Sequence, residues 1–438
     1  MNIFLLHPTD TLFFRDGRPM SGSLTGHGAA WPLPTVINHA FHAALHRAGA
    51  TFDETHVHRR GRSGDYTDTR DRKFGSLVSA GPFPVCTSGA AHTWFFPRPL
   101  DAGKPDSTEV TLQPLSTHPY PSSLPSPLQY AAANTQPPNK ETPNAWWSEG
   151  AWNTYLGSRQ RDNLSARIFF KSDADFADTE HTIGIGISAD TGTQNEEQFY
   201  SAHYLRLRDG WRLGSLAEAL DKVDGDSTTK RDLLEILFPN SDTRTPVIVG
   251  GQQRLCTVER HNNEKLPLPV GAGINGTRVK WVLLTPAIFP QIGEHKGGWL
   301  PSWIDHESGR VMLLDGPGKN FAERHKVAVG KSIAARLVAA VTGKPVPVTG
   351  YALPNTVDPD RTEGGSKSAH LAVPAGSVYY FEAETSGAAQ VLAAALNWHG
   401  AGDTTTIRNR RSTLFGEKGF GLGVCGNWEC LPASQTPD

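Results

Sequence analysis

The order of apolar segments in the second half of the chain constrains its fold more than any other feature. Six segments there have the hydrophobic spacing of strands or helices. The strand-like segments are residues 279–284, 346–353, 377–383 and 422–429, and the helix-like segments are residues 325–342 and 387–398. Strand, helix, two strands, helix, strand is the order of a βαββαβ unit. The second half is therefore predicted to form one α+β domain.

The first half has the elements of a second domain of this kind. The predicted elements are a strand at 1–6, a helix that begins near Thr35 and ends at Gly49, a hairpin of 182–187 with 199–207, short helices at 215–223 and 229–238, and strands at 246–251 and 253–259. A chain of 438 residues is also longer than one hydrophobic core usually serves. We predict an α+β protein with two ferredoxin-like (RRM-like, βαββαβ) domains, residues 1–245 and 246–438, and long inserted loops.

The longest of these loops is rich in proline. Residues 97–143 contain eleven prolines, and the stretch ends near the paired Trp146 and Trp147. Proline cannot donate a backbone hydrogen bond, which excludes the stretch from helix interiors and central strands. We expect an inserted loop or arm at about 97–147, and a loop of this length inside a domain is usually functional.

The overall charge gives no indication of nucleic-acid binding, because the formal net charge is −2. The four cysteines form no C-x-x-C pair and the histidines form no metal-binding motif, so neither a metal nor a cofactor is expected. The N-terminus lacks the basic region of a signal peptide, and no apolar stretch is long enough to span a bilayer. These features predict a cytoplasmic protein without membrane contact.

Patterns that would indicate an enzyme are incomplete. The Gly-Lys-Ser at 330–332 lacks the earlier glycine of a P-loop, because His325 stands at that position. No G-x-S-x-G elbow is present. His39, His42 and His46 fall on the polar side of the first predicted helix, where contact with solvent accounts for them. We expect no catalytic residues and no enzyme activity.

The segment from Phe415 to Trp428 is the most informative about function. Five of the eleven residues from 416 to 426 are glycine, and the N–H groups of such a segment can approach and cradle a phosphate. Basic residues lie just before or within it, namely Arg408, Arg410, Arg411 and Lys418. The alternative interpretation is a tight glycine turn that packs against a sheet, and the spacing alone does not decide between the two.

Two other segments are equally open. Arg15 and Arg18 flank an Asp-Gly pair, and Arg254 follows Gly250-Gly251, so each segment is either a phosphate contact or a turn with solvated side chains. Residues 172–205, in contrast, contain seven acidic residues and neither lysine nor arginine. This stretch should repel phosphate, which favours a protein partner or a solvated hairpin.

Together these segments resemble the third subunit of the Cmr complex, the type III-B CRISPR effector, within the RAMP superfamily. The resemblance runs through the chain at residues Asp10–Pro19, Trp31–Thr35, His181–Ile185, Asp190–Thr193, Phe199–Ser201, Leu284–Ala287, Val373–Phe381 and Gly419–Gly423. The last of these resembles the glycine-rich loop that defines RAMP proteins. The order of the matches over most of the chain identifies the family.

The resemblance implies two ferredoxin-like domains that bind the 5′ tag of the crRNA in a groove between them. It also implies contacts with the large subunit that carries a palm domain, and with the repeating backbone RAMP subunit. Target cleavage in such complexes belongs to the backbone subunit, which agrees with the missing catalytic motifs. The Pro-rich insertion is longer than the family pattern leads us to expect, and its role is open.

We predict the RNA contacts accordingly. The tag phosphates would be held by Arg15, Arg18, Arg254, Arg408, Arg411 and Lys418. Backbone N–H groups from Gly419 through Gly421 to Gly423 would approach the RNA, and Phe420 would stack on a base. One alternative is a RAMP endoribonuclease that processes precursor crRNA, with His27 or His39 as the general base. Another is a scaffold that binds only proteins.

Overall fold

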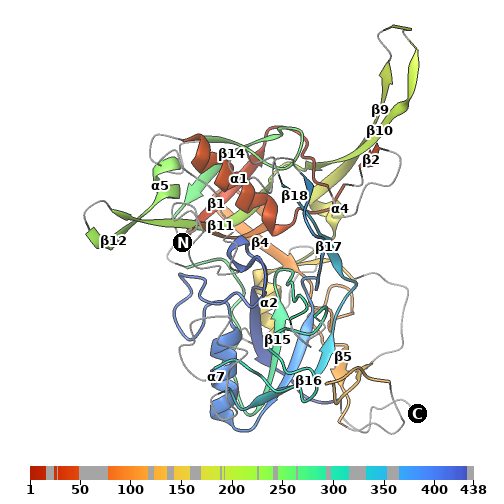
Figure 1. Cartoon of the computed structure of the whole chain (residues 1–438). Coiled ribbons are helices and arrows are strands. Elements are labelled where there is room, and N and C mark those ends of the chain that lie inside the picture. Colours follow the sequence, from red (N-terminus) through yellow and green to blue (C-terminus); the bar gives the residue numbers. More distant parts are fainter. Residues whose placement is uncertain are drawn as a thin grey trace.

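The computed structural model shows two antiparallel sheets, one in each half of the molecule, and a long hairpin that projects beside the first sheet (Figure 1). It describes the chain apart from residues 16–23, 27, 49–76, 117–122, 136–142, 158–168, 188–189, 192, 224–225, 240–244, 263–264, 293–296, 315–331, 353–364 and 432–438. None of the helices in these described parts is long and apolar enough to cross a lipid bilayer.

The first sheet has nine strands in the described part of the chain. In pairing order they are β13 (Thr245–Ile248), β14 (Leu255–His261), β1 (Asn2–Pro8), β11 (Trp211–Val223), β3 (Leu77–Ser88), β4 (Ala91–Pro97), β7 (Trp146–Ser148) and β8 (Phe170–Lys171), and β12 (Asp226–Asp232) pairs with β11. All neighbours are antiparallel. Numbered along the chain, the four central strands β1, β3, β11 and β14 lie in the order 4-1-3-2, as in a βαββαβ sheet.

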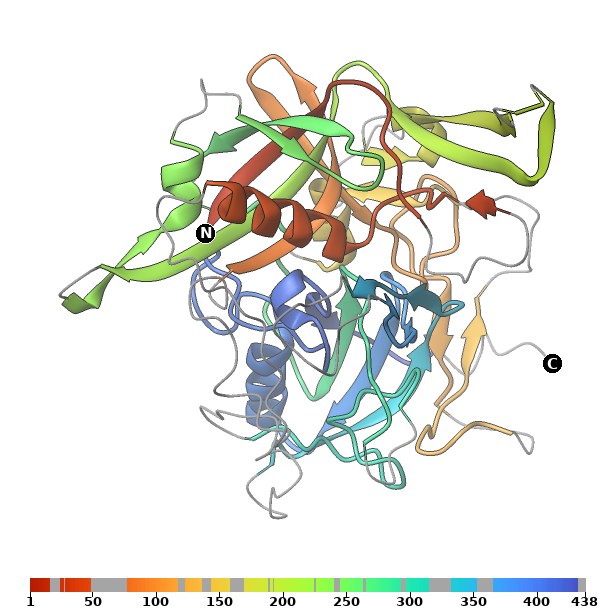
Figure 2. The ribbon, with the colours of Figure 1, turned by 45° about the horizontal axis from the view of Figure 1, so that its top comes forward.

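Two helices cover one face of this sheet (Figure 2). Helix α1 (Pro34–Arg47) connects β1 to β3, and the short α5 (Leu233–Leu237) lies between β12 and β13. The ring of Phe4 in β1 lies 4.9 Å from that of Phe41 in α1 and 5.5 Å from that of Phe238, between centroids. These rings form the centre of the first core, which holds α1 against the sheet.

The second sheet has the same strand order. Its strands pair as β16 (Ala335–Val341), β21 (Val378–Ala383), β15 (Arg278–Leu283) and β22 (Gly423–Asn427), again 4-1-3-2 when read from β22. Helix α7 (Ser386–Leu396) joins β21 to β22 and buries Leu392 and Leu396 in the core beside Trp281. Thr385 caps α7, because its side chain accepts a hydrogen bond from the Ala388 N–H.

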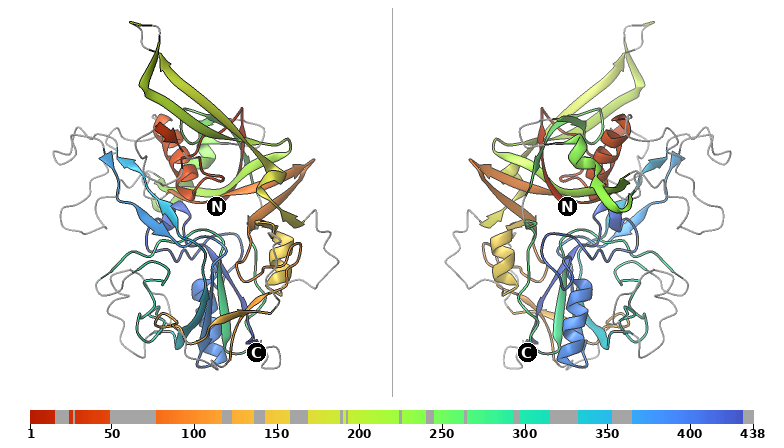
Figure 3. Two further views of the ribbon diagram at one scale, coloured as in Figure 1. Left: turned by 90° about the vertical axis from the view of Figure 1, so that its right-hand side faces the viewer. Right: turned by 90° about the vertical axis from the view of Figure 1, so that its left-hand side faces the viewer.

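The projecting hairpin consists of β9 (Ala177–Ile187) and β10 (Gln194–Leu207), with β2 (Leu24–Gly26) parallel to β10 at its base. Both side views show its tip well beyond the rest of the molecule (Figure 3). The remaining elements are the strand pairs β5 (Leu112–Pro114) with β6 (Ala132–Asn134), β17 (Val346–Val348) with β20 (His370–Ala372), and β18 (Tyr351–Ala352) with β19 (Gly365–Ser366), the helices α2 (Glu149–Tyr155) and α4 (Asp173–Phe176), and the 3₁₀ turn η2 (Gly416–Lys418).

The Pro-rich segment joins the two halves. Its residues leave β4 of the first sheet and run along the second sheet, where the N–H groups of Gln129 and Tyr130 both donate to the Val338 carbonyl of β16. The fully buried Asp101 accepts hydrogen bonds from the hydroxyl groups of Tyr155 and Tyr380. The Pro-rich segment is thus anchored to the second sheet by a buried carboxylate.

Several sequence predictions are wrong in detail. Residues 215–223 form part of the central strand β11, and residues 335–341 form the edge strand β16. Both stretches are rich in alanine and leucine, but pairing with neighbouring strands overrides their helix propensity. The first helix begins at Pro34, so Thr35 is not its N-cap. Strands β13 and β14, which follow residue 245, pair within the first sheet.

Candidate nucleic-acid interface

The glycine-rich segment lies where the two halves of the molecule meet. Turn η2 contacts β3 and α1 of the first half, while β22, which follows directly, belongs to the second sheet. Gly419 has a φ of 97°, and a Cβ atom there would come within 2.9 Å of the Ser79 carbonyl oxygen in β3. We call this contact between η2, Gly419–Leu422, α1 and β3 the seam.

The glycines are required by the protein's own packing. A Cβ on Gly421 would lie 2.0 Å from the Ser412 nitrogen, and one on Gly423 would lie 2.1 Å from the Trp281 Nε1. At these two positions another part of the same chain occupies the space beside the backbone, so packing within the protein is enough to account for the glycines.

The N–H groups of the segment are also engaged within the chain. Gly419 donates to the Gly416 carbonyl at 3.0 Å and Gly421 donates to the Pro286 carbonyl at 2.8 Å. The Leu422 N–H donates to the Thr285 hydroxyl at 3.0 Å. These buried donors have their partners inside the protein, as the alternative interpretation of a packed glycine turn requires.

Phe420 is fully buried. It packs in a small core with Ile288, Val348 and Ala372, and its ring meets that of Phe415 edge to face at 5.9 Å between centroids. In the free chain this side chain has no exposed face for a nucleobase, so the base stacking predicted for it stays without support from its position. The aromatic ring instead packs in the core beneath the seam.

The arginines before the loop have different roles. Arg411 donates from Nε to the Ala395 carbonyl and thereby satisfies an orphan carbonyl at the C-terminus of α7. Arg408 is exposed and lies over Gly400 and Gly402. Arg410 has Nε and Nη2 buried without a hydrogen-bond partner among the described residues. Of the two arginines predicted to contact RNA here, Arg408 is the accessible one.

Three basic side chains from separate segments gather at the surface of the seam. The Nζ of Lys418 lies 3.3 Å from the Nε2 of His39 in α1, and it also lies over the Phe415 ring at 4.9 Å from the centroid. Desolvation, followed by the positive charges of Lys418 and Lys367, lowers the pKa of His39 to about 4. Desolvation likewise lowers the pKa of Lys418. We call His39, Lys367 and Lys418 the seam cluster.

The sequence singled out Lys418 and His39, but it did not predict that they meet. Lys418 was predicted as a phosphate contact, but His39 was assigned to the solvent-facing side of its helix or, alternatively, to a nuclease base. The two residues are 379 positions apart, and no spacing rule connects them. The lysine–histidine contact depends on the packing of α1 against β3 and η2.

Arg15 and Arg254 lie elsewhere, at the base of the hairpin. The guanidinium of Arg254 is 4.8 Å from the centre of the Tyr204 ring in β10, and its Nη1 is 3.5 Å from a carboxylate oxygen of Asp10. Arg15 is exposed and pairs with Gly28, which packs against His203 of β10. Arg18 and His27 lie outside the described residues. The predicted basic residues therefore lie apart: Lys418 is at the seam, Arg408 lies over Gly400 and Gly402, the Arg411 guanidinium caps α7, and Arg15 and Arg254 are at the hairpin base.

Two acidic residues of the hairpin form ion pairs with arginines of the same hairpin. Arg208 forms an ion pair with Asp178 at 2.7 Å, and Arg206 pairs with Glu180 and, at 2.9 Å, with Asp10. Both arginines lie just beyond the window that appeared purely acidic, and the antiparallel register brings them opposite its carboxylates. The expected repulsion of phosphate therefore does not hold for Asp178 and Glu180.

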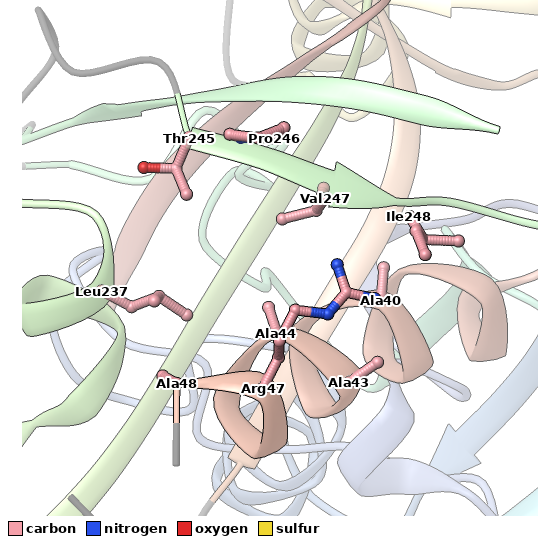
Figure 4. A pocket seen from close by; sticks show the side chains of 10 residues that line it. All are labelled: Ala40, Ala43, Ala44, Arg47, Ala48, Leu237, Thr245, Pro246, Val247 and Ile248. Atoms are coloured by element: carbon pink, nitrogen blue, oxygen red, sulfur yellow. The ribbon is translucent and has the colours of Figure 1, made fainter. Parts of the chain in front are cut away.

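A small hollow lies between α1, α5 and β13 (Figure 4). Alanines of α1 and the residues Leu237, Val247 and Ile248 make most of its wall, and Arg47 extends across it. Arg47 is the one charged side chain among the ten lining residues, so the hollow contains no acid–base pair. The described residues also contain no group of three or more His, Cys, Asp or Glu that could hold a metal ion.

Three solved structures resemble the chain at low identity. A chain of the type III-B Cmr-beta complex bound to cognate target RNA is 16% identical, with 86% of each chain covered and a TM-score of 0.39. A chain of the same complex bound to target RNA and AMPPnP, in state 1, is 14% identical with the same coverage and a TM-score of 0.38. A chain of the Csm3–Csm4 subcomplex of type III-A is 10% identical, with 88% of this chain and 93% of that chain covered and a TM-score of 0.34.

The sequence itself matches a family. Comparison with curated proteins gives no match. The model of the CRISPR-associated Cas_Cmr3 family, in contrast, matches residues 4–428, which is nearly the whole chain. This match confirms the resemblance found in the sequence, and the chain belongs to the Cas_Cmr3 family of CRISPR-associated proteins.

Proposed function

We propose that this chain is a cytoplasmic, non-catalytic RNA-binding subunit of a type III-B CRISPR effector. In this role it holds the 5′ tag of the crRNA and links the large palm-domain subunit to the backbone RAMP subunits. The observation that carries the proposal is the seam cluster, where Lys418 and His39 meet at 3.3 Å between the two halves of the chain. Family membership supports the assignment to the effector.

We also infer that the two halves are ferredoxin-like domains. The 4-1-3-2 strand order of both sheets supports this, as do α1 and α5 on the first sheet and α7 on the second. The inferred tag site is the seam between the two domains. The accessible Lys418 holds a phosphate there, Arg408 holds one beside Gly400 and Gly402, and Arg15 and Arg254 hold a second part of the RNA near the hairpin base. Arg18 is proposed as an RNA contact from the sequence alone.

The hairpin supports the assembly role. Ile183, Ile185 and Ile187 alternate along β9 and are 59%, 51% and 66% exposed, so they form one apolar strip on an arm that extends beyond the rest of the molecule. Exposed apolar strips of this kind are typical of contact surfaces. In the proposed assembly the strip is covered by another component of the effector.

The geometry favours RNA holding over RNA cleavage. The nuclease alternative needs a histidine base, and His39 is the nominated residue that the structure describes. In the free chain its pKa is lowered to about 4, first by desolvation and then by Lys418 and Lys367. Its Nε2 also lies 3.3 Å from the Lys418 ammonium group, a hydrogen-bond donor that competes with any substrate hydroxyl for this nitrogen. Incubation of the purified chain with repeat RNA in the absence of metal checks this, because cleavage would favour the nuclease.

Removal of the two accessible cations should weaken binding of tagged RNA. We expect the Arg408→Gln/Lys418→Gln double variant to lose roughly tenfold or more in affinity, and the slope of log affinity against log salt to fall by about 1.4, since each phosphate contact with a single strand contributes about 0.7. Fluorescence anisotropy of the full chain with a 5′-tagged RNA, at several salt concentrations, measures both quantities.

The matched control is Lys344→Gln, because Lys344 is an exposed lysine just beyond the end of β16 and is not a member of the seam cluster. It should leave the affinity within about twofold of the wild type. An equal loss in the control and the double variant would show that only diffuse charge matters, and an unchanged double variant would remove the seam from the RNA site.

A further inference from the structure

Two basic groups of the seam cluster lie so close together that they would repel each other strongly if both were charged. The Nζ of Lys418 and the Nε2 of His39 are 3.3 Å apart, and Lys367 adds a third positive charge to the field at His39. At such a separation two unit charges near a protein surface repel each other strongly. The arrangement is therefore stable with His39 neutral, so that its ring nitrogen accepts a hydrogen bond from the Lys418 ammonium group.

The elements around His39 offer little negative charge. Strands β3 and β13, which pack against α1, carry no charged residue, and Glu235 of α5 pairs with Arg260 instead. Turn η2 contributes Glu417 beside Lys418. The other titratable neighbours are His370 of β20, whose ring meets Phe415 at 6.0 Å between centroids, and the residues His42 and Arg47 further along α1.

We propose that a phosphate group of the bound RNA sits between Lys418, His39 and Lys367, and that His39 takes up a proton from solvent when this phosphate binds. The inference rests on the proposed RNA-binding function and deepens it. A phosphate within hydrogen-bond distance reverses the sign of the field at the imidazole, so that the ring becomes a second charged donor to the same anion. The phosphate also neutralises the repulsion between the histidine and the two lysines.

The proton uptake fixes the direction of the pH dependence. In the free protein the pKa of His39 is lowered to about 4, so its ring is neutral above pH 5. A bound phosphate raises that pKa, and the complex then holds more protons than the free protein. Affinity must therefore rise as the pH falls. If binding restores the ordinary histidine pKa of about 6.5, the affinity gains about tenfold between pH 7.5 and pH 5.5.

The experiment measures the affinity of the full chain for a 5′-tagged single-stranded RNA between pH 5.5 and pH 7.5 by fluorescence anisotropy. We expect the wild type to gain about tenfold at the lower pH and His39→Gln to gain less than about twofold. His42→Gln is the matched control, because His42 lies one turn further along the same helix and should keep the full dependence. Calorimetry in two buffers of different ionisation enthalpy should count about one proton taken up by the wild type at pH 5.5.

The outcomes separate this inference from the proposed function. Equal pH dependence in the wild type and in His39→Gln, with RNA still bound, would overturn the inference and leave the tag-binding role standing. Loss of the dependence in His42→Gln alone would overturn it as well, because the proton would then belong to His42. Failure of the wild type to bind tagged RNA at every pH would overturn the proposed function and this inference with it.

Discussion

Replacement of Lys280 by methionine should lower the free energy of unfolding by about 3–5 kcal/mol, because it leaves a buried carboxylate without its cation. Lys280 is 4% exposed and Asp101 is fully buried, with 3.5 Å between Nζ and Oδ2. The hydroxyl groups of Tyr155 and Tyr380 donate to the same carboxylate at 2.7 and 3.1 Å, and Nζ lies 3.7 Å from the centre of the Tyr155 ring. This network ties the Pro-rich arm to the second sheet and to α2.

Urea unfolding of the full chain measures the loss. The matched control is Lys104→Met, which removes an ion pair with Glu109 in the same arm at 3.2 Å. Lys104 and Glu109 are both well exposed, so the Lys104→Met substitution should lower the free energy of unfolding by less than about 1 kcal/mol. The double variant Lys280→Met/Asp101→Asn should be destabilised by less than the sum of its single variants, since neither charge is then left alone. Equal losses for Lys280→Met and Lys104→Met would contradict the buried pair.

The second large effect is expected at Gly421. Its φ is +74°, and a Cβ atom would meet backbone nitrogen 2.0 Å away, at Ser412. Neither the strain nor the contact can relax through a flexible side chain, so Gly421→Ala should destabilise the protein by about 3 kcal/mol or more. The measurement is again the midpoint of urea unfolding.

Gly416→Ala is the control in the same loop. The nearest atom to its added Cβ would be 3.4 Å away, an ordinary contact with the Cβ of Arg410, and we expect a change below about 1 kcal/mol. The comparison decides what the glycine-rich segment does. If Gly421→Ala kept its stability but lost RNA binding, the segment would be an RNA cradle after all, and its assignment to the seam would fall.

The sequence predicted elements well where local patterns dominate. The spacing of apolar residues was enough to predict four elements: the strand at the N-terminus, the helix at residues 34–47, the projecting hairpin and the alanine-rich helix at 386–396. It failed at β11 and β16, whose alanine and leucine residues favour a helix in isolation. Both segments are strands because they pair with β1, β3 and β21, which are distant in the sequence. A prediction from neighbouring residues alone has no access to such pairing.

The site was predicted less well for the same reason. Glycine-rich spacing indicated a backbone that approaches another chain closely, but it could not show that the neighbour is the protein's own β3. The burial of Phe420 and the cap that Arg411 forms on α7 also depend on tertiary packing. The contact of Lys418 with His39 joins segments 379 residues apart, so only the folded chain shows it.

The claim that the seam holds the tag of the guide RNA can be tested by photocrosslinking. A tagged RNA with one 4-thiouridine in the tag is bound to the full chain, irradiated, and the attached peptides are identified by mass spectrometry. If the seam holds the tag, we expect crosslinks in peptides that contain His39, Lys367 or Lys418. Crosslinks confined to the hairpin at residues 177–207, with none at the seam, would contradict it.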